Sequence, residues 1–221
     1  MKEPINYLVV PGLEHYPHVT YTWVIMALFI LLAVLVRKSL NPKSPTGAYN
    51  LIDSLVVGLI SFSDSVIGKE GRPYFPLLAT LGLFILIANI FGLIPGAVSP
   101  TANVNTNAAM AITVFLVYQY AGLSKHGFRY IKHFLGPSPA LAILLFPIEI
   151  ISHLARPVTL TMRLFGNIKG EDLVILVLGF LIPLLLPVPM LAFALFTSVL
   201  QAGIFVLLTM VYLAGALDDA H

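Results

Sequence analysis

Residues 149–172 read EIISHLARPVTLTMRLFGNIKGED and place charged and polar side chains in the middle of a strongly apolar chain. On an α-helix, with about 100° between successive residues, the polar positions fall within about 40° of Arg163 around the helix axis. The residues between them are mostly apolar and can face lipid or other helices. This stretch therefore predicts a long helix with one polar stripe, made of Arg163, Glu149, Ser152, Arg156, Thr159, Asn167 and Gly170.

Arg163 is the deepest charge of this stripe, because its sequence neighbours are apolar. A guanidinium keeps its proton in proteins, since its pKa exceeds about 12. At the centre of a membrane the charge costs about 2.5 to 3.5 kcal/mol on insertion scales, so it needs an anion or water opposite it. No carboxylate lies one helical turn away. We therefore expect its partner on another element or another chain; the alternative is a structural arginine that reaches an interface or pairs internally.

The composition indicates an integral membrane protein. Of 221 residues, 58% are hydrophobic and 10% are charged, whereas soluble domains average about 25% charged residues. The segment from Leu173 to Leu217 has no Asp, Glu, Lys or Arg, although one span needs only about 20 residues. The absence of cysteine excludes disulfides and thiol chemistry, and a net charge of +2 gives no reason to expect nucleic acid. The N-terminus shows no signal-peptide pattern, so the first apolar run is expected to be a retained span.

Lysine and arginine mark the loops that are expected on the cytoplasmic side. They follow the first apolar run, at 37–43, and the third, at 125–132, which predicts an external N-terminus and a cytoplasmic C-terminus. Residues 48–67 contain Asp53 and Asp64 and are expected to form an amphipathic helix at the membrane surface. Five crossings fit this asymmetry, whereas six would need a full turn near Gly203.

The expected fold is an all-α integral membrane protein with about five membrane-crossing helices and one amphipathic surface helix. The last two helices are expected to be long and tilted, as an antiparallel hairpin. The segments of this single membrane domain are an external segment at 1–20, spans at 21–36, 75–95 and 106–120, the surface helix at 48–67, the long helix with Arg163 at 140–182 and the final helix at 190–217.

Gln201 lies in the middle of the final helix. An unpaired amide in hydrocarbon costs several kcal/mol, so it needs a hydrogen-bond partner. Such a glutamine by itself most often connects two helices. Beside the Arg163 stripe of an antiparallel neighbour, Gln201 can instead line a polar seam.

The run RPVTLTMRLFGN (156–167), followed by LQAGIFVLLTMVYLAGALDDAH (200–221), closely resembles subunit a of F-type ATP synthases, the stator of the membrane sector. The resemblance extends to NIFGLIP (89–95) and NVNTN (103–107), and so to nearly the whole chain. It implies that Arg163 faces the proton-carrying carboxylate of the rotating c ring. It also implies that Asn167 and Gln201 support this arginine or line the outer channel, and that Glu149 is the acid toward the cytoplasmic end.

The outer side departs from the family pattern. Asp172 occupies the place of the family's outer half-channel acid, but Glu171 stands where small residues are usual, so the choice between them stays open. A histidine that pairs with this acid in some relatives is replaced by Ala194, and Gly92 replaces an acid that can follow Asn89. The outer channel is therefore expected to depend more on water and amides than on a carboxylate–histidine relay.

The resemblance implies a proton-translocating stator with two half-channels and one essential arginine. Its partners would be the c-subunit ring, the b-subunit stalk, the remaining ATP synthase subunits, membrane lipid and protons or Na⁺, in a bacterial inner membrane. Neither a cofactor, a metal nor nucleic acid is expected. The chain is not expected to be an enzyme on its own, and it has no P-loop for nucleotide.

Two other functions remain open. The first is a secondary transporter whose Arg156 and Arg163 bind an anionic substrate, although such carriers commonly show internal repeats and none is visible here. The second is a purely structural assembly subunit. A metal site has little support, because the three candidate histidines lack ligand spacing: His126, His133 and His153.

Overall fold

The computed structural model describes residues 17–39, 47–94, 96–127, 130, 139–181 and 187–218. Within these ranges the chain is helical and has no strand, which confirms the all-α class expected from the sequence. The elements in order are α1 (Pro17–Ser39), α2 (Gly47–Ile67), the 3-10 helix η1 (Lys69–Tyr74), α3 (Phe75–Gly92), the 3-10 helix η2 (Pro100–Ala102), α4 (Val104–His126), α6 (Pro139–Leu181) and α7 (Pro187–Leu217).

The helix boundaries lie near those expected from the sequence, with α1 and α4 longer than the spans at 21–36 and 106–120. α3 ends at Gly92 instead of residue 95, because a chain usually leaves the helix before a proline. Residues 1–16 of the expected external segment, and residues 95 and 182 at two expected helix ends, lie outside the described residues.

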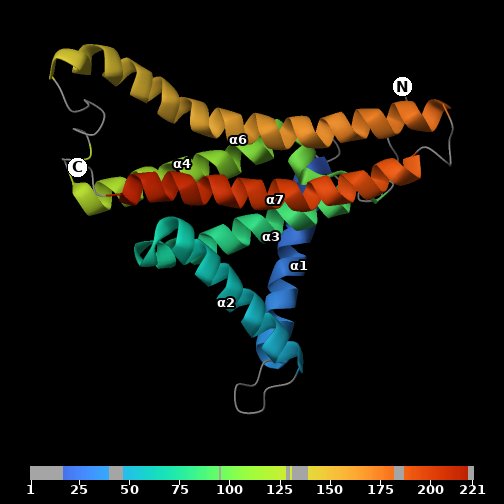
Figure 1. The fold of residues 1–221 in the computed structure, drawn as a ribbon. Coiled ribbons are helices and arrows are strands. Elements are labelled where there is room, and N and C mark those ends of the chain that lie inside the picture. The colour runs from blue at the N-terminus through green and yellow to red at the C-terminus, as the bar shows by residue number, and fades with distance from the viewer. Residues whose placement is uncertain are drawn as a thin grey trace.

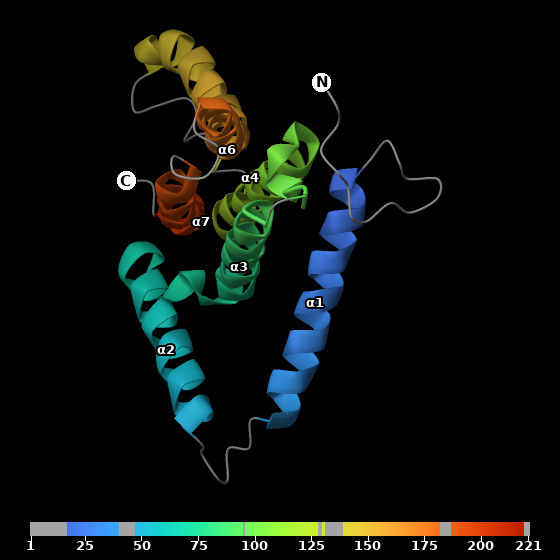
Figure 2. The same cartoon turned by 90° about the vertical axis from the view of Figure 1, so that its right-hand side faces the viewer.

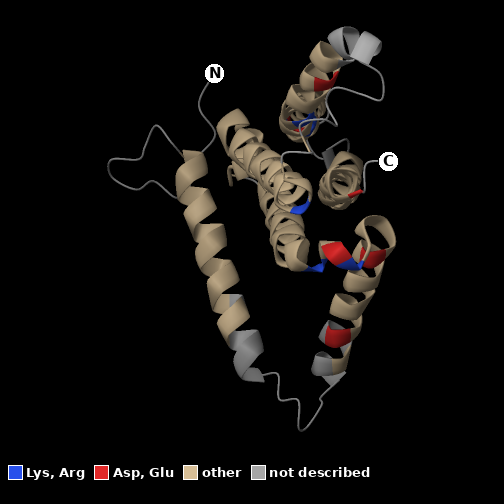
Figure 3. Ribbon diagram, turned by 90° about the vertical axis from the view of Figure 1, so that its left-hand side faces the viewer, with Lys and Arg blue, Asp and Glu red and all other residues tan. Residues whose placement is uncertain are grey.

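Four helices form the main bundle: α3, α4, α6 and α7 lie side by side, and α6 runs antiparallel to α7 (Figure 1). α1 and α2 leave this bundle at a steep angle and approach each other at their far ends (Figure 2). By length and composition, the stretches Lys69–Gly92 and Val188–Leu217 can cross a membrane, among the residues searched. Charged residues are found along α6 and around η1, whereas α3 is free of them (Figure 3). The number of crossings therefore stays a prediction.

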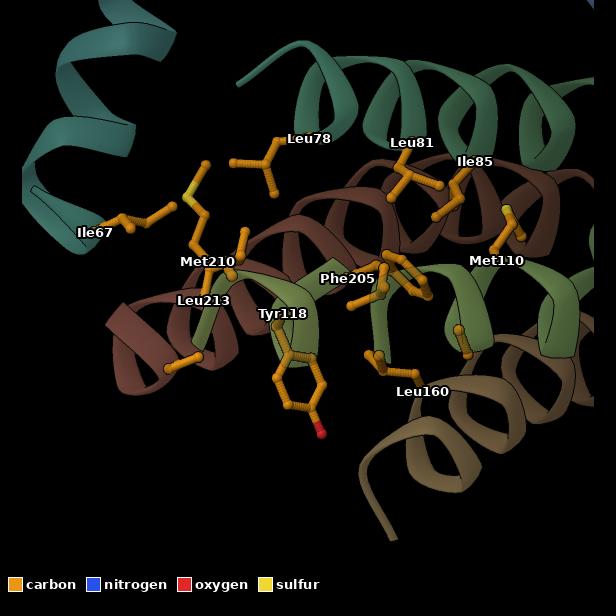
Figure 4. Close-up of a cluster of buried hydrophobic side chains, with 14 of the residues drawn as sticks. Ile67, Leu78, Leu81, Ile85, Met110, Tyr118, Leu160, Phe205, Met210 and Leu213 are labelled. Atoms are coloured by element: carbon orange, nitrogen blue, oxygen red, sulfur yellow. The ribbon is translucent and has the colours of Figure 1, made fainter. Parts of the chain in front are cut away.

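One apolar core joins the bundle helices with the end of α2. Its largest buried side chains include Tyr118 on α4 and Phe205 on α7, which are both 1% exposed. Leucine, isoleucine and methionine side chains from these two helices and from α2, α3 and α6 converge on the same cluster (Figure 4): Ile67, Leu78, Leu81, Ile85, Met110, Leu160, Met210 and Leu213. This packing fixes which face of each long helix is buried.

The connection between α3 and α4 is held by buried hydrogen bonds. Thr101 Oγ1 donates to Asn89 Oδ1 at 2.7 Å, and Asn107 Nδ2 donates to the carbonyl of Thr101 at 2.8 Å. The side chain of Asn103 accepts a hydrogen bond from the backbone N–H of Asn105 at 2.8 Å, which caps α4. These contacts fix the amide of Asn89 at one end of the bundle.

At the opposite end, Lys125 connects three elements. Its Nζ donates to the carbonyl of Leu217 at the end of α7, at 2.6 Å, and to Glu70 Oε2 in η1, at 2.7 Å. A lysine near a helix C-terminus satisfies a carbonyl that has no partner within the helix. The last turn of α4 therefore holds the end of α7 in place.

The contact between α3 and α7 depends on a glycine. A Cβ added at Gly82 would meet Val206 Cγ2 at 2.8 Å, whereas one added at Gly58 on α2 would meet nothing within 4 Å. We expect G82V to destabilise the protein by about 1–3 kcal/mol through overpacking, and the matched control G58V to have little effect. The thermal unfolding midpoint in detergent measures both. Equal midpoints for the two variants would contradict this close packing of α3 on α7.

Candidate functional site

The polar stripe of α6 is divided between two environments. Ser152, Thr159 and Arg163 are exposed, whereas Arg156 and Asn167, on the edge turned toward the bundle, are half-buried. A Cβ at Gly166 or Gly170 would meet nothing within 4 Å. The outward face around Arg163 is therefore open and lined by small residues, which allow another helix to approach closely.

Arg163 itself makes no hydrogen bond or ion pair with any residue that the structure describes. Its side chain is exposed on the outward face of α6. The buried residues beside it, Leu160 and Leu164, are 1% and 0% exposed and apolar. The described part of the chain thus provides no anion for this guanidinium.

The buried face of α6 carries a titratable residue at each end. His153 is 7% and Glu171 is 8% exposed. They are 18 residues apart, which corresponds to five full helical turns and about 27 Å, so they share one side of the helix. Between them lie the buried apolar side chains of Leu160, Leu164 and Ile168. Two polar clusters are therefore separated by an apolar layer at the level of Arg163.

The first cluster surrounds Glu171. Asn167 Nδ2 donates to Glu171 Oε1 at 2.8 Å, and the Thr197 hydroxyl donates to the same oxygen from α7. Glu171 and Asn89 line a cavity of about 310 Å³. Asn89 Nδ2 is buried and has no hydrogen-bond partner among the described residues. Unpaired buried polar groups of this kind are the usual partners of internal water.

Asp172 differs from Glu171 in its surroundings, although it lines the same cavity. Its side chain is 51% exposed, and Asp172 Oδ2 lies 3.8 Å from Lys169 Nζ, which is also exposed. An exposed ion pair of this kind has little net energy. The structure thus places Glu171, and not its neighbour, between the two long helices.

The second cluster lies toward the other end of α6. Glu149 Oε1 lies 3.2 Å from His153 Nε2, and His153 Nδ1 lies 3.2 Å from the Tyr118 hydroxyl. The Arg156 guanidinium sits 5.5 Å from the centre of the Tyr118 ring and 4.9 Å from that of Tyr212. These are cation–π distances. The cluster thus connects three helices, α4, α6 and α7.

The two clusters share one antiparallel register of α6 and α7. Arg156 lies 15 residues before Glu171, and Tyr212 lies 15 residues after Thr197, so the Arg156–Tyr212 and Glu171–Thr197 contacts are aligned. The same register places Gln201 level with Asn167. Gln201 is 6% exposed, and its Nε2 has no hydrogen-bond partner among the described residues. It is a buried amide donor at the inner edge of the Glu171 cluster.

Arg156 and Arg163 do not form a common anion site. They are two helical turns apart, about 10 Å along the axis. Arg156 packs on two tyrosine rings, while Arg163 faces outward. The candidate histidines are also separate: His126 stacks on Tyr130 at 6.5 Å between ring centroids, His153 belongs to the second cluster, and His133 lies outside the described residues. Among the described residues, no group of three potential ligands that could hold a metal is found.

The sequence-based prediction missed two participants of these clusters: it considered His153 only as a metal ligand, and it did not single out Tyr118. A wider helical projection would have found the first, because His153 and Glu171 both lie about 80° from Arg163 at 100° per residue. Thr197 and Tyr212 lie within about 40° of Gln201 on the final helix, so the sequence places them on the same stripe, although it gives them no role. Tyr118 on α4 carries no comparable signal, since its position depends on how the helices pack.

Comparisons with known proteins point to one family. The family model described as ATP synthase A chain matches residues 19–214. ATP synthase subunit a 1 of Syntrophotalea carbinolica is 48% identical over 213 residues, which cover 95% of this chain and 91% of the relative. ATP synthase subunit a of Geobacter sulfurreducens is 45% identical over 92% of this chain and 88% of its own length. That of Syntrophobacter fumaroxidans is 48% identical over 93% and 86%, respectively. A match over nearly the whole length shows that the chain belongs to the ATP synthase subunit a family.

Proposed function

We propose that this chain is the proton-conducting stator of an F-type ATP synthase, with two half-channels that meet beside Arg163. Family membership supports a membrane-integral bacterial subunit that takes part in ATP synthesis and proton transport within a complex of ATP synthase subunits. The finer assignment, to a c-subunit ring that rotates against α6 and a b-subunit stalk that holds the chain in place, is our proposal. On its own the chain is not an enzyme.

The observation that carries the proposal is the position of Arg163. It is a permanent cation on the open face of a long helix, beside an apolar layer that separates two polar clusters. A charged residue inside a membrane generally indicates an ion pathway, above all when the helix bundle that carries the residue provides no partner for the charge. A carboxylate carried by another subunit is the simplest partner.

The arginine then performs two tasks. A ring carboxylate must be neutral to pass through lipid, because an unpaired charge there is very costly. Opposite Arg163 the fixed positive charge favours the ionised carboxylate, so the proton leaves by one half-channel and a new one arrives from the other. Arg163 also opposes direct passage of a proton between the half-channels, since like charges repel. The membrane potential contributes about 2.3 kcal/mol per charge per 100 mV.

The outer half-channel is assigned to the Glu171 cluster. Its cavity and its buried carboxylate provide room and an acceptor for water, and the amide nitrogens of Asn89 and Gln201, which have no partner among the described residues, provide donors. The inner half-channel is assigned to the cluster around Glu149. Leu160, Leu164 and Phe205 form the apolar layer between them. With the basic residues at the ends of α1 and α4, this assignment places the N-terminus outside and the C-terminus in the cytoplasm of a bacterial inner membrane.

A cysteine cross-link tests the proposed ring contact. The chain contains no cysteine, so one introduced thiol is unique. We expect G166C, one turn from Arg163 on the open face of α6, to form a disulfide with a cysteine placed next to the carboxylate of the c subunit. Gel analysis of the assembled complex under oxidising conditions measures the adduct.

The matched control is L116C, which is 60% exposed on α4. We expect no adduct with the ring from this position. A cross-link of equal yield at both positions, or none at residue 166 in an assembled complex, would reject the proposed contact face.

A further inference from the structure

His153 bridges an exposed and a buried polar group. Its side chain is 9% exposed, and both ring nitrogens have a polar neighbour at 3.2 Å: the Tyr118 hydroxyl beside Nδ1 and Glu149 Oε1 beside Nε2. On one side lies Glu149, whose side chain is 35% exposed. On the other side lies Tyr118, which is 1% exposed. The imidazole therefore stands between the surface end of the second cluster and the interior of the bundle.

The pair of Glu149 and His153 has the composition of a site that binds one proton. With reference pKa values, at pH 8 an isolated glutamate is protonated roughly 0.02% of the time, whereas a histidine is protonated about 3% of the time. Proton exchange is most efficient when the pKa of the group lies near the working pH. A carboxylate alone would thus be a poor collector of protons from a neutral or alkaline compartment. An adjacent imidazole provides a group that is protonated more often at the same pH.

We infer that His153 is the proton-collecting group of the inner half-channel and that it exchanges its proton with water through Glu149. The inference rests on the proposed function and on the orientation given above. In uptake, a hydronium ion gives a proton to the Glu149 carboxylate and leaves as water; the new O–H bond then breaks, and an Nε2–H bond forms on the neutral imidazole of His153. The products are water, an ionised carboxylate and an imidazolium, so the pair has gained the one positive charge that the hydronium ion carried. Release reverses the same steps and returns that charge to water.

The groups around the imidazole fit this role. Tyr118 from α4 holds Nδ1 at 3.2 Å and leaves Nε2 to face the carboxylate. The positive charge of Arg156 is held against the rings of Tyr118 and Tyr212. Tyr130, whose pKa is raised by burial, also responds to Glu149 and Arg156. Within the described residues, the imidazolium would thus lie next to the Glu149 carboxylate and near the Arg156 guanidinium.

The test is ATP-driven proton pumping by the complete complex in inverted membrane vesicles, where the inner face meets the bath. We expect H153Q to pump at nearly the normal rate at bath pH 6 and at least about tenfold more slowly at pH 8. With reference pKa values, an isolated glutamate is protonated about 2% of the time at pH 6, close to the roughly 3% of a histidine at pH 8, but only about 0.02% of the time at pH 8. In H153A, free imidazole in the bath should restore part of the rate at pH 8. Quenching of a pH-sensitive dye measures both effects.

H126Q is the matched control, because His126 lies at the same end of the bundle and stacks on Tyr130 outside the cluster. It should leave the pH profile unchanged. The inference is overturned if H153Q follows the wild-type profile, if its loss is equal at every pH without rescue by imidazole, or if H126Q shifts the profile as much. Pumping that survives R163A would reject the proposed function itself, whereas a normal H153Q profile beside an inactive R163A complex rejects this inference alone.

Discussion

Replacement of Arg163 by alanine is expected to lower proton-driven ATP synthesis by roughly 10- to 1000-fold. An opposite charge favours ionisation of a nearby carboxylate by about 1.4 to 4 kcal/mol, which corresponds to roughly 10- to 1000-fold in the ionised fraction. Without that charge the ring carboxylate would keep its proton, and the ring would turn without ion exchange. Because Arg163 is exposed, its truncation leaves no cavity in the core, and the complex should still assemble.

The same variant, R163A, should raise the passive leak of protons, because the barrier between the half-channels is removed.

R163K is expected to recover little activity, since lysine lacks the planar fork of donors and loses its proton more readily when desolvated. Lys169, a 47% exposed cation on the same helix, provides the matched control: K169Q should retain synthesis within about twofold, because exposed ion pairs contribute little. ATP synthesis in vesicles energised by an imposed gradient, compared at equal amounts of assembled complex, measures the activity of R163A, R163K and K169Q. Normal synthesis by R163A would contradict the role of the arginine.

The second large effect is expected at Glu171. We expect E171Q to lower proton-driven synthesis by about 100-fold, in the range typical of a lost proton-transfer group. Glutamine keeps the oxygen that accepts from Asn167 and Thr197, so the packing of α6 on α7 should survive. The substitution therefore removes the titratable proton and little else.

D172N is the matched control for this prediction. The family resemblance puts Asp172 at the position of the outer acid but leaves the choice between the two acids open, whereas burial and hydrogen bonding favour Glu171. We expect D172N to synthesise ATP at close to the wild-type rate. The reverse result, with D172N inactive and E171Q active, would assign the outer half-channel to the exposed acid. Rates measured over a range of external pH would also separate the two acids, because only the loss of a proton-exchanging group changes the shape of the profile.

The long helices and the position of Arg163 were predictable from the sequence because they depend on local properties. The apolar runs are long enough to form helices in a membrane, and the polar residues from Glu149 to Gly170 share one side of a helix whatever surrounds it. The directions of α1 and α2 relative to the bundle were not predictable (Figure 2). They depend on contacts between elements that are remote in sequence.

The sequence by itself determined the class of protein, the family and the presence of a cation, Arg163, with no carboxylate one helical turn away. It left open which of two adjacent acids lies inside the bundle, and it gave His153 no role. Only the tertiary structure decided these points, because neighbouring residues on a helix point about 100° apart. The packing of α4 and α7 on α6 selects the buried face, and that face carries Glu171 at one end and His153 at the other.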